Sequence, residues 1–279
     1  MADDTTHLSL ARGEGALRVV LLCGDGPQHR YLAHLLHQNF TLTGLVVEPS
    51  AQQRRRLWEV GHRRTWRHRV IHEWRQRLLG YRAYRRNFFA GVGAGFGWPD
   101  CTSAHPPWIN DDSVVEALTR WRPDVTVVCG TSLIRPEVLD RAGLAINVHA
   151  GLLPYYRGNQ CFFMALYRGD YGRIGASLHV ATAELDGGPL LAVVRPPMAP
   201  TDHEESLYSR TMRQTMLVLV DLVHRMAAGE SIPAARQSAI GRTYRNSDRR
   251  LRHDLHWGLF RLTGRRRCPV ATDWSISYQ

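Results

Sequence analysis

The 279-residue sequence predicts an α/β fold with a Rossmann-like, mostly parallel sheet, helices on both of its faces, an arginine-rich helical insertion and a short C-terminal appendage. Two observations predict this class. Short apolar runs alternate with amphipathic, helix-like stretches along most of the chain, which is typical of parallel strands joined by crossover helices. The chain also opens with one complete strand, turn, helix and strand unit between residues 17 and 48.

The opening unit begins with an apolar run, Leu17 to Leu22, that ends at the turn Cys23-Gly24-Asp25-Gly26. Apolar residues then recur at helical spacing from Tyr31 to Leu36, and Leu42 to Val47 predicts a second buried strand. The glycines of the turn do not complete the G-x-G-x-x-G pattern, and Glu48 is the one acid near the position that a ribose would need. Helix packing therefore explains this turn about as well as a bound dinucleotide does.

The alternation of strands and helices resumes after residue 100. Helices are expected at 111–121, 136–142, 160–168 and 206–228, and strands at 124–129, 144–148, 176–180 and 190–194. After Pro233 the composition shifts toward Arg, His and Trp, which sets the core boundary near residue 235. We therefore divide the chain into a flexible tail (1–16), a core (17–235) that carries the insertion (51–97), and a basic C-terminal extension (236–279).

The composition is that of a globular protein, with 44% hydrophobic residues and no apolar run near the roughly 20 residues that span a bilayer. The first residues are polar and acidic and lack the layout of a secretion signal, so we expect a cytoplasmic protein. The 5 cysteines are scattered without a C-x-x-C pair, which indicates reduced thiols rather than a structural zinc site or a disulfide framework.

The net charge of +11 is concentrated in two segments. Residues 54–86 contain twelve arginines against two glutamates, and residues 242–267 contain nine arginines against two aspartates. One or two amphipathic helices are expected in the first segment, followed by a flexible exit at Gly91 to Gly97. The favoured interpretation is a solvated helical insertion that covers the sheet edge. The alternative is a basic aromatic surface that docks an anion, whether a phosphorylated substrate, RNA or a membrane headgroup layer.

Three polar side chains suggest chemistry at the ends of predicted strands, namely Asn147, His149 and Asp186. An amine that attacks a carbonyl group builds negative charge on oxygen and positive charge on nitrogen, so such a site needs hydrogen-bond donors and a proton acceptor. Residues 147 and 149 can face the same side of an extended strand. The Asn147 amide can donate to the oxygen, and His149 can donate to it when protonated. Asp186 can stabilise that imidazolium, order a water and help to carry the proton away.

Three stretches also carry a resemblance to a known superfamily: Asn147 to Gly158 (NVHAGLLPYYRG), Ala165 to Asp170 (ALYRGD), and His179 to Pro189 with its Glu184-Leu185-Asp186-Gly187-Gly188. They resemble the catalytic core of the folate-dependent formyltransferases, which include glycinamide ribonucleotide, methionyl-tRNA and sugar-amine formyltransferases. The loop Ser132 to Glu137 resembles the one that cups the pterin in this family. The likeness covers residues 17–48 and 100–230 and does not extend to the insertion or the extension.

The resemblance implies a Rossmann-like fold, 10-formyltetrahydrofolate as the formyl donor and no metal. It implies catalytic roles for Asn147, His149 and Asp186. It also implies that the substrate is bound by Arg157 and Gly158. The residues that it implies for folate binding are Ser132, Leu133, Ile134, Arg135, Val180 and Leu185. Backbone groups of residues 133–135 would meet the heterocycle.

The sequence departs from the family pattern in ways that leave the acceptor open. Many members have serine where Gly151 stands, so any hydroxyl contact made there is absent. Arg157-Gly158 looks more like the tRNA and sugar enzymes, whereas residues 185–189 look more like the glycinamide ribonucleotide enzyme. The segment after residue 235 is short for the C-terminal β-barrel of a methionyl-tRNA enzyme, although it is basic enough to touch phosphates and could instead close a homodimer.

The leading hypothesis is an N-formyltransferase that acts on the amine of a small molecule, such as an amino sugar, a nucleotide-linked sugar or a specialised metabolite, with or without a phosphate. One alternative is a hydrolase that releases formate from the same folate. The other is a non-enzymatic protein that binds RNA or an anionic surface on a formyltransferase-like core. Nucleic acid is not the favoured partner, because all three catalytic residue types are retained.

Overall fold

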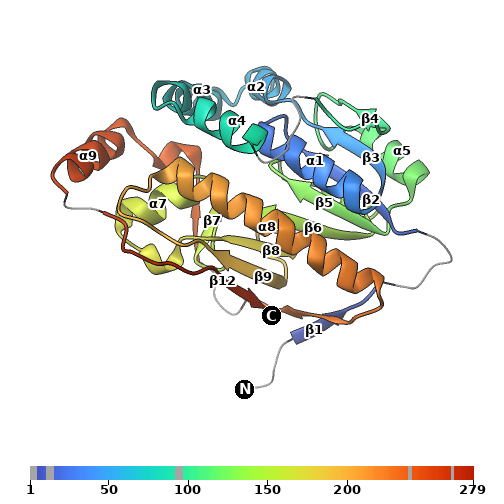
Figure 1. Cartoon of the computed structure of the whole chain (residues 1–279). Coiled ribbons are helices and arrows are strands. Elements are labelled where there is room, and N and C mark those ends of the chain that lie inside the picture. The colour runs from blue at the N-terminus through green and yellow to red at the C-terminus, as the bar shows by residue number, and fades with distance from the viewer. Residues whose placement is uncertain (1–4, 11–15, 92–96, 238–240, 265–266) are drawn as a thin grey trace.

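The computed structural model describes residues 5–10, 16–91, 97–237, 241–264 and 267–279 (Figure 1). No helix in these ranges is long and apolar enough to cross a membrane. The flexible exit expected at Gly91 to Gly97 lies largely outside the described residues.

The centre of the molecule is a 10-stranded mixed sheet of strand order β1-β10-β9-β8-β6-β5-β2-β3-β4, with β12 paired to β9 beside this path. Neighbours from β6 to β4 pair in parallel, and the strands from β8 outward pair antiparallel. The loop 181–189 between β8 and β9 is too short for a crossover helix, so β9 pairs antiparallel with β8. The strands are β1 (Thr5–Leu8), β2 (Arg18–Cys23), β3 (Thr41–Val47), β4 (Ser103–Ala104), β5 (Val125–Cys129), β6 (Leu144–His149), β8 (Ala176–Val180), β9 (Leu190–Arg195), β10 (Ile232–Ala235) and β12 (Ser275–Tyr278).

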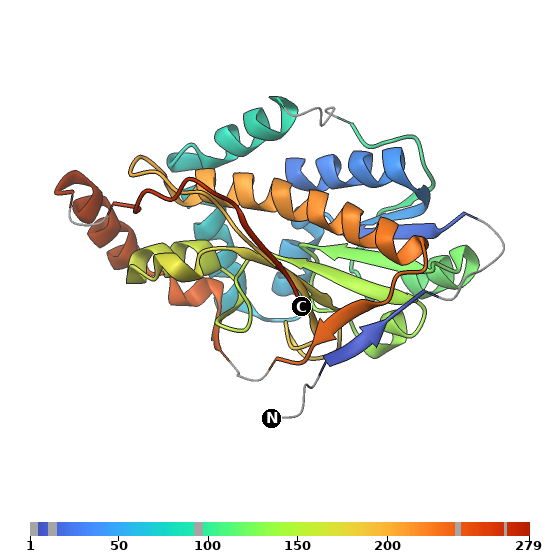
Figure 2. The same ribbon diagram turned by 60° about the horizontal axis from the view of Figure 1, so that its bottom comes forward.

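Helices cover both faces of this sheet (Figures 1 and 2). Val19 and Leu21 of β2 pack on one face with residues of α1, α4 and α8, whereas Val20 and Leu22 pack on the other with residues of α5 and α6. This alternation follows from the two-residue period of a strand, and it confirms the predicted α/β class. The helices are α1 (Pro27–Asn39), α2 (Ser50–Glu59), α3 (Arg63–Leu78), α4 (Tyr81–Gly91), α5 (Asp112–Trp121), α6 (Pro136–Leu139), α7 (Cys161–Arg168), α8 (Glu204–Ala227) and α9 (Leu251–Leu262), with short 3-10 turns at Tyr171–Arg173 and Asn246–Asp248.

The insertion forms three helices, α2, α3 and α4, where one or two were expected. Its helices break at Gly61 and Gly80, whose φ angles of +76° and +69° favour glycine. The insertion does not simply cover a sheet edge. Helix α4 packs against α1 and α8, and residues of α2 and α3 line a cavity at the carboxyl ends of the parallel strands.

Both terminal segments are tied to the core. The tail expected to be flexible contains β1, which pairs with β10 from Thr5–Ala235 to Leu8–Ile232, so that prediction is wrong for these residues; residues 1–4 and 11–15 lie outside the described part. The C-terminal extension returns to the sheet through β12, and its β11 (Arg242–Tyr244) pairs with β7 (Tyr156–Gly158). Backbone hydrogen bonding to the core thus orders both segments where they are described.

Candidate active site

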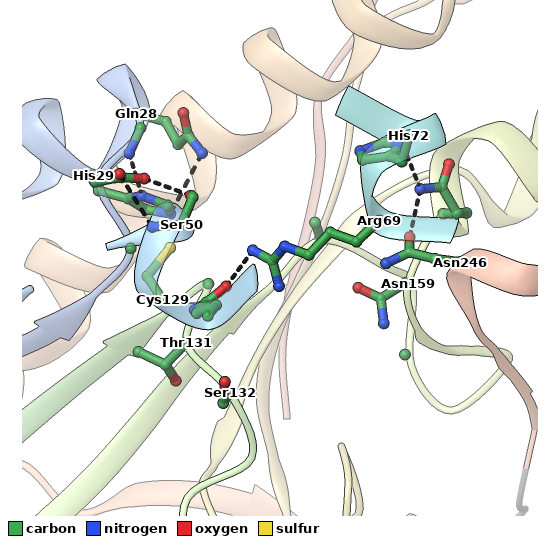
Figure 3. Close-up of a pocket in the computed structure, with 18 of the residues that line it drawn as sticks. Gln28, His29, Ser50, Arg69, His72, Cys129, Thr131, Ser132, Asn159 and Asn246 are labelled. Carbon is green, nitrogen blue, oxygen red and sulfur yellow. Dashed lines mark hydrogen bonds between the residues drawn. The ribbon is translucent and has the colours of Figure 1, made fainter. Parts of the chain in front are cut away.

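A cavity of about 1850 Å³ lies where β2, β5 and β6 end, and α2, α3 and α4 contribute to its wall. Its lining brings together most of the predicted site residues, namely Asn147, His149, Gly158, Leu185, Asp186 and the loop Ser132, Leu133, Ile134 and Arg135. Figure 3 shows Arg69 of α3 reaching across this cavity from the side of His72 toward Ser50 and Cys129. The volume is larger than the roughly 300–1,000 Å³ of a typical small-molecule pocket, so two reactants can be held together.

Asn147 is oriented by a histidine from the neighbouring strand. Asn147 of β6 lies directly opposite His179 of the antiparallel strand β8. The ring Nδ1 of His179 is 2.9 Å from the carbonyl oxygen of Val180, and its Nε2 is 2.9 Å from Nδ2 of Asn147. Since a carbonyl only accepts, His179 donates through Nδ1 and accepts from the Asn147 amide through Nε2. One Asn147 N–H is therefore fixed, and the other is left to act in the cavity.

His149 follows two residues later and is buried. Its Nε2 is 3.0 Å from the carbonyl oxygen of Tyr156, to which it donates, and its Nδ1 is 3.4 Å from Oδ1 of Asp186. Burial lowers the pKa of the His149 imidazole, and the Asp186 carboxylate opposes that shift. Both ring nitrogens thus face oxygen atoms of the protein, and the Nδ1 that faces Asp186 can accept a proton.

Asp186 joins three segments of the site. Its backbone has a φ of +50°, an unusual conformation for a residue other than glycine, and its Oδ2 accepts from the backbone N–H of Gly158 at 2.7 Å. Its Oδ1 lies 3.7 Å from Nε2 of His179 as well as close to His149. Burial alone would raise the pKa of the carboxyl, but His149, His179 and the Gly158 N–H outweigh it and lower the pKa to about 2. Asp186 is therefore ionised at neutral pH.

Two side chains, Asn110 and Glu48, hold the loop 132–135. The sequence analysis did not single out Asn110, and it considered Glu48 only as a possible ribose ligand. Asn110 donates to the carbonyl of Leu133 at 2.9 Å and accepts from the N–H of Arg135 at 2.6 Å. The buried Glu48 accepts from the backbone N–H groups of Ser132 and Ile109 and from the Gln53 side chain. Among the described residues, the backbone N–H and C=O of Ile134 keep no such partner. Glu48 is fully engaged and does not present its carboxylate to a ribose.

The hydrogen bonding of the turn after β2 also argues against a dinucleotide site. The N–H of Gly24 donates to the Cys129 carbonyl, and the N–H of Gly26 donates to Nδ1 of His29. Asp25 accepts from the N–H and the hydroxyl of Ser50 at the start of α2. The turn therefore offers a carboxylate where a pyrophosphate would need unengaged N–H groups.

Two predicted binding residues do not reach the cavity. Arg157 is buried, donates to Glu184 at 2.8 Å and is absent from the lining, and so is Val180. Gly158 instead acts on Asp186 through its backbone. Gly151 has no room for the serine that many members of the resembling family have there, because a Cβ would lie 2.5 Å from Nε2 of His149 and 2.5 Å from the Tyr156 oxygen.

His179 and Gln237 also hold the candidate site together, and the sequence analysis did not single out either of them. Gln237, just after β10, donates to the carbonyls of Asp186 and Gly188 at 2.8 and 2.7 Å and so braces the loop that carries Asp186. An antiparallel alignment of the predicted strands 144–148 and 176–180 could have placed His179 beside Asn147. Sequence offers no comparable signal for Gln237.

Arginines outnumber acidic residues among the described residues of the cavity lining, nine to six. Arg54 and Arg85 are neutralised by bidentate contacts to Glu73 and Glu205, whereas Arg69 donates to Gln53 and reaches Glu73 only at 3.8 Å. Burial lowers the pKa of His72 to about 3, and nearby guanidinium groups, Arg249 and Arg69 among them, act in the same direction. No group of three or more metal-ligating side chains occurs among the residues described. The wall is suited to an anionic ligand.

Comparison with known proteins agrees with this arrangement. Residues 102–223 match the family model described as formyl transferase. A methionyl-tRNA formyltransferase from Ralstonia nicotianae is 34% identical over 148 residues, which cover 52% of this chain and 45% of that protein. The chain thus matches about half the length of this curated relative.

The fold is shared with solved structures of low identity. A sugar N-formyltransferase from Shewanella sp FDAARGOS_354 superposes with a TM-score of 0.54 at 16% identity, over 88% of this chain and 87% of that one. WlaRD, a sugar 3N-formyl transferase solved in the presence of dTDP and 5-N-formyl-THF, gives a TM-score of 0.52 at 11% identity, over 85% and 73%. Residues 102–223 are thus similar to formyltransferases in sequence, and the chain shares its fold with solved sugar N-formyltransferases.

Proposed function

We propose that this protein is an N-formyltransferase that moves a formyl group from 10-formyltetrahydrofolate to the amine of an anionic small molecule, such as a nucleotide-linked amino sugar. The observation that carries the proposal is the cluster of Asn147, His179, His149 and Asp186 in a cavity large enough for two reactants. The names of the structural neighbours support an amino-sugar acceptor, and those of the sequence relatives a tRNA-linked one.

The residues of the cluster divide the chemistry between oxygen and nitrogen. The amine lone pair attacks the formyl carbon, a proton leaves the attacking nitrogen, and the bond from the formyl carbon to the donor nitrogen breaks as the donor nitrogen takes up a proton. The unengaged N–H of Asn147 stabilises the negative charge that develops on the formyl oxygen. Asp186, with a pKa of about 2, is too weak a base to hold the proton at neutral pH. His149 therefore takes it on Nδ1, and Asp186 stabilises the resulting imidazolium.

The loop 132–135 suits the folate donor. Its side chains Leu133 and Ile134 are apolar, and the backbone N–H and C=O of Ile134 are left for the edge of a heterocycle once Asn110 and Glu48 have fixed their neighbours. Leu185 lines the facing side of the cavity and is 42% exposed. The donor supplies a formyl carbon already activated by its attachment to nitrogen; the protein needs to orient it and exclude water.

The deciding experiment incubates the protein with 10-formyltetrahydrofolate and candidate amines, including amino sugars with and without a nucleotide diphosphate, and follows the mass increase of a formyl group. The same reactions are assayed for formate. The transferase is supported if the amine becomes formylated and little formate is released when the amine is left out. Rapid formate release that no amine stimulates would instead establish the hydrolase, in which water replaces the amine.

We predict that Asn147→Ala, His149→Ala and Asp186→Asn each lower kcat by about 100-fold or more, because each removes a group that acts on developing charge. Asparagine tolerates the left-handed backbone at position 186, so this change tests the charge without adding strain. His105→Ala, an exposed histidine outside the cavity lining, is the matched control. Steady-state rates beside thermal unfolding curves check the prediction, and wild-type turnover in a variant removes that residue from the mechanism.

The acid limb of kcat should lie below pH 6.5. Burial lowers the pKa of His149 below its ordinary value near 6.5, so the neutral, proton-accepting form persists at neutral pH and is lost as the pH falls through the lowered value. Asp186→Asn removes the carboxylate that raises this pKa and should move the midpoint to still lower pH. NMR titration of the His149 ring in both proteins measures the shift, and kcat at saturating substrates measures its consequence. A midpoint above 6.5 in the wild type contradicts the assignment.

Arg69→Gln should raise KM for an anionic acceptor by about tenfold or more and leave kcat and the KM for folate nearly unchanged. Arg69 lies across the cavity with incomplete neutralisation by Glu73, so it is available to an anionic group of the acceptor. Arg67→Gln, an exposed position on the same helix that does not line the cavity, carries the same charge change as a control. Equal KM values for both variants would show that the cavity cations serve another purpose.

A further inference from the structure

Helix α9 exposes a continuous apolar stripe. Leu251, Leu255, Leu259 and Leu262 are 71%, 66%, 55% and 87% exposed. At about 100° per residue, their spacing confines all four side chains to roughly 80° of the helix circumference. Scattered exposed leucines are ordinary, but four in one stripe are the mark of an interaction surface.

The opposite face of α9 holds the helix on the body of the protein. Trp257 is buried, and Tyr167 of α7 packs against the rings of His253 and Phe260 at centroid distances of 4.9 and 6.4 Å. These three positions on α9 lie on the other side of the helix from the leucines. The leucine stripe therefore faces away from the core.

Helix α3 lies beside α9 and exposes apolar side chains of its own. Arg75 of α3 donates to Asp254 of α9 at 2.8 Å, and both helices lie at the same end of the molecule in Figure 1. Ile71, Trp74 and Leu78 are 45%, 58% and 82% exposed and follow helical spacing. We call the exposed apolar residues of α3 and α9 together the α3–α9 face.

The exposed charge around this face is positive. Glu73 and Asp254, the acids within α3 and α9, are both occupied by arginines of the protein. Exposed arginines without an acidic partner among the described residues surround the apolar side chains, and they are Arg63, Arg64, Arg67, Arg77, Arg252 and Arg261. Arg252 and Arg261 flank the leucine stripe of α9 on its two sides.

We propose that the α3–α9 face docks the protein on an anionic phospholipid surface, with the leucines in the acyl boundary and the arginines at the headgroups. Leucine side chains gain little from RNA, whose bases stack on aromatic rings, but they gain from hydrocarbon. A second copy of the chain would bring two arginine-rich faces together, whereas anionic lipid complements them. The inference does not depend on the formyl transfer reaction.

Docking in this way would bring the cavity close to the lipid surface. Trp74 belongs to the α3–α9 face and also lines the cavity, as does Arg77, one of the arginines beside that face. Arg75 holds α3 to α9, and His72 holds it to the core, with its Nδ1 2.9 Å from Nε2 of Gln160. Helix α3 therefore contributes to both the α3–α9 face and the cavity wall.

Vesicle co-sedimentation of the full chain tests the proposal, with vesicles of phosphatidylcholine alone or mixed with phosphatidylglycerol. The wild type should bind the mixed vesicles and not the neutral ones, and added salt should weaken the binding. Leu255→Ala with Leu259→Ala should lower the binding by about tenfold or more at unchanged charge, since each buried CH₂ contributes to the affinity.

A charge-matched pair separates docking from a general loss of positive charge. Leu255→Glu with Leu259→Glu should abolish binding, whereas Gln38→Glu with Thr119→Glu, at exposed positions of α1 and α5, should retain most of it. Thermal unfolding verifies that all variants fold. Absence of binding to anionic vesicles overturns the proposal. So does a dimer in sedimentation velocity that the leucine variants dissociate, or binding of an RNA oligonucleotide in preference to the vesicles.

Discussion

The site depends on one buried carboxylate. Asp186 holds two imidazoles and one backbone N–H around itself, and these contacts come from β6, β7 and β8. Together these contacts favour the ionised form strongly enough to overcome the cost of burial. The carboxylate also determines which ring nitrogen of His149 accepts a proton, because it faces Nδ1. A neutral residue in its place would leave both histidines without their common partner, so the charge organises the geometry as well as the chemistry.

The left-handed backbone at Asp186 is stabilised from outside the motif. Gln237 binds the carbonyls of Asp186 and Gly188, and Gly188 itself approaches the backbone so closely that a Cβ would lie 1.9 Å from the Val180 oxygen. The strain at one residue is thus offset by contacts from the strand before it and from the segment after β10. For this reason the C-terminal extension contributes to the site although the family resemblance stops before it.

The sequence predicted the parts of the site that are local and missed those that depend on pairing. Asn147 and His149 fall two residues apart on one strand, and the loop 132–135 follows a predicted strand, so pattern alone located them. His179 required the register between β6 and β8, and Asn110 required a loop contact across the sheet end. Arg157 lies within the same motif, yet its guanidinium is buried against Glu184 and does not itself line the cavity, because motif membership does not fix the direction of a side chain.

The sequence left two interpretations of the arginine-rich insertion open, a solvated helical cover and a basic surface that docks an anion. The structure has features of both, because the arginines of the insertion lie in two different environments. Toward the interior, burial forces each guanidinium to find a carboxylate or an amide, as Arg54 and Arg85 do. Burial also lowers the pKa of His72, and the guanidinium groups around it act in the same direction. Toward the exterior, Arg63, Arg64 and Arg67 remain solvated and pay no such desolvation cost. Helix α3 carries arginines of both kinds, with Arg69 at the cavity and Arg63, Arg64 and Arg67 at the exterior. A change to an inward arginine is therefore expected to act on a ligand in the cavity, and a change to an outward one on whatever the surface meets.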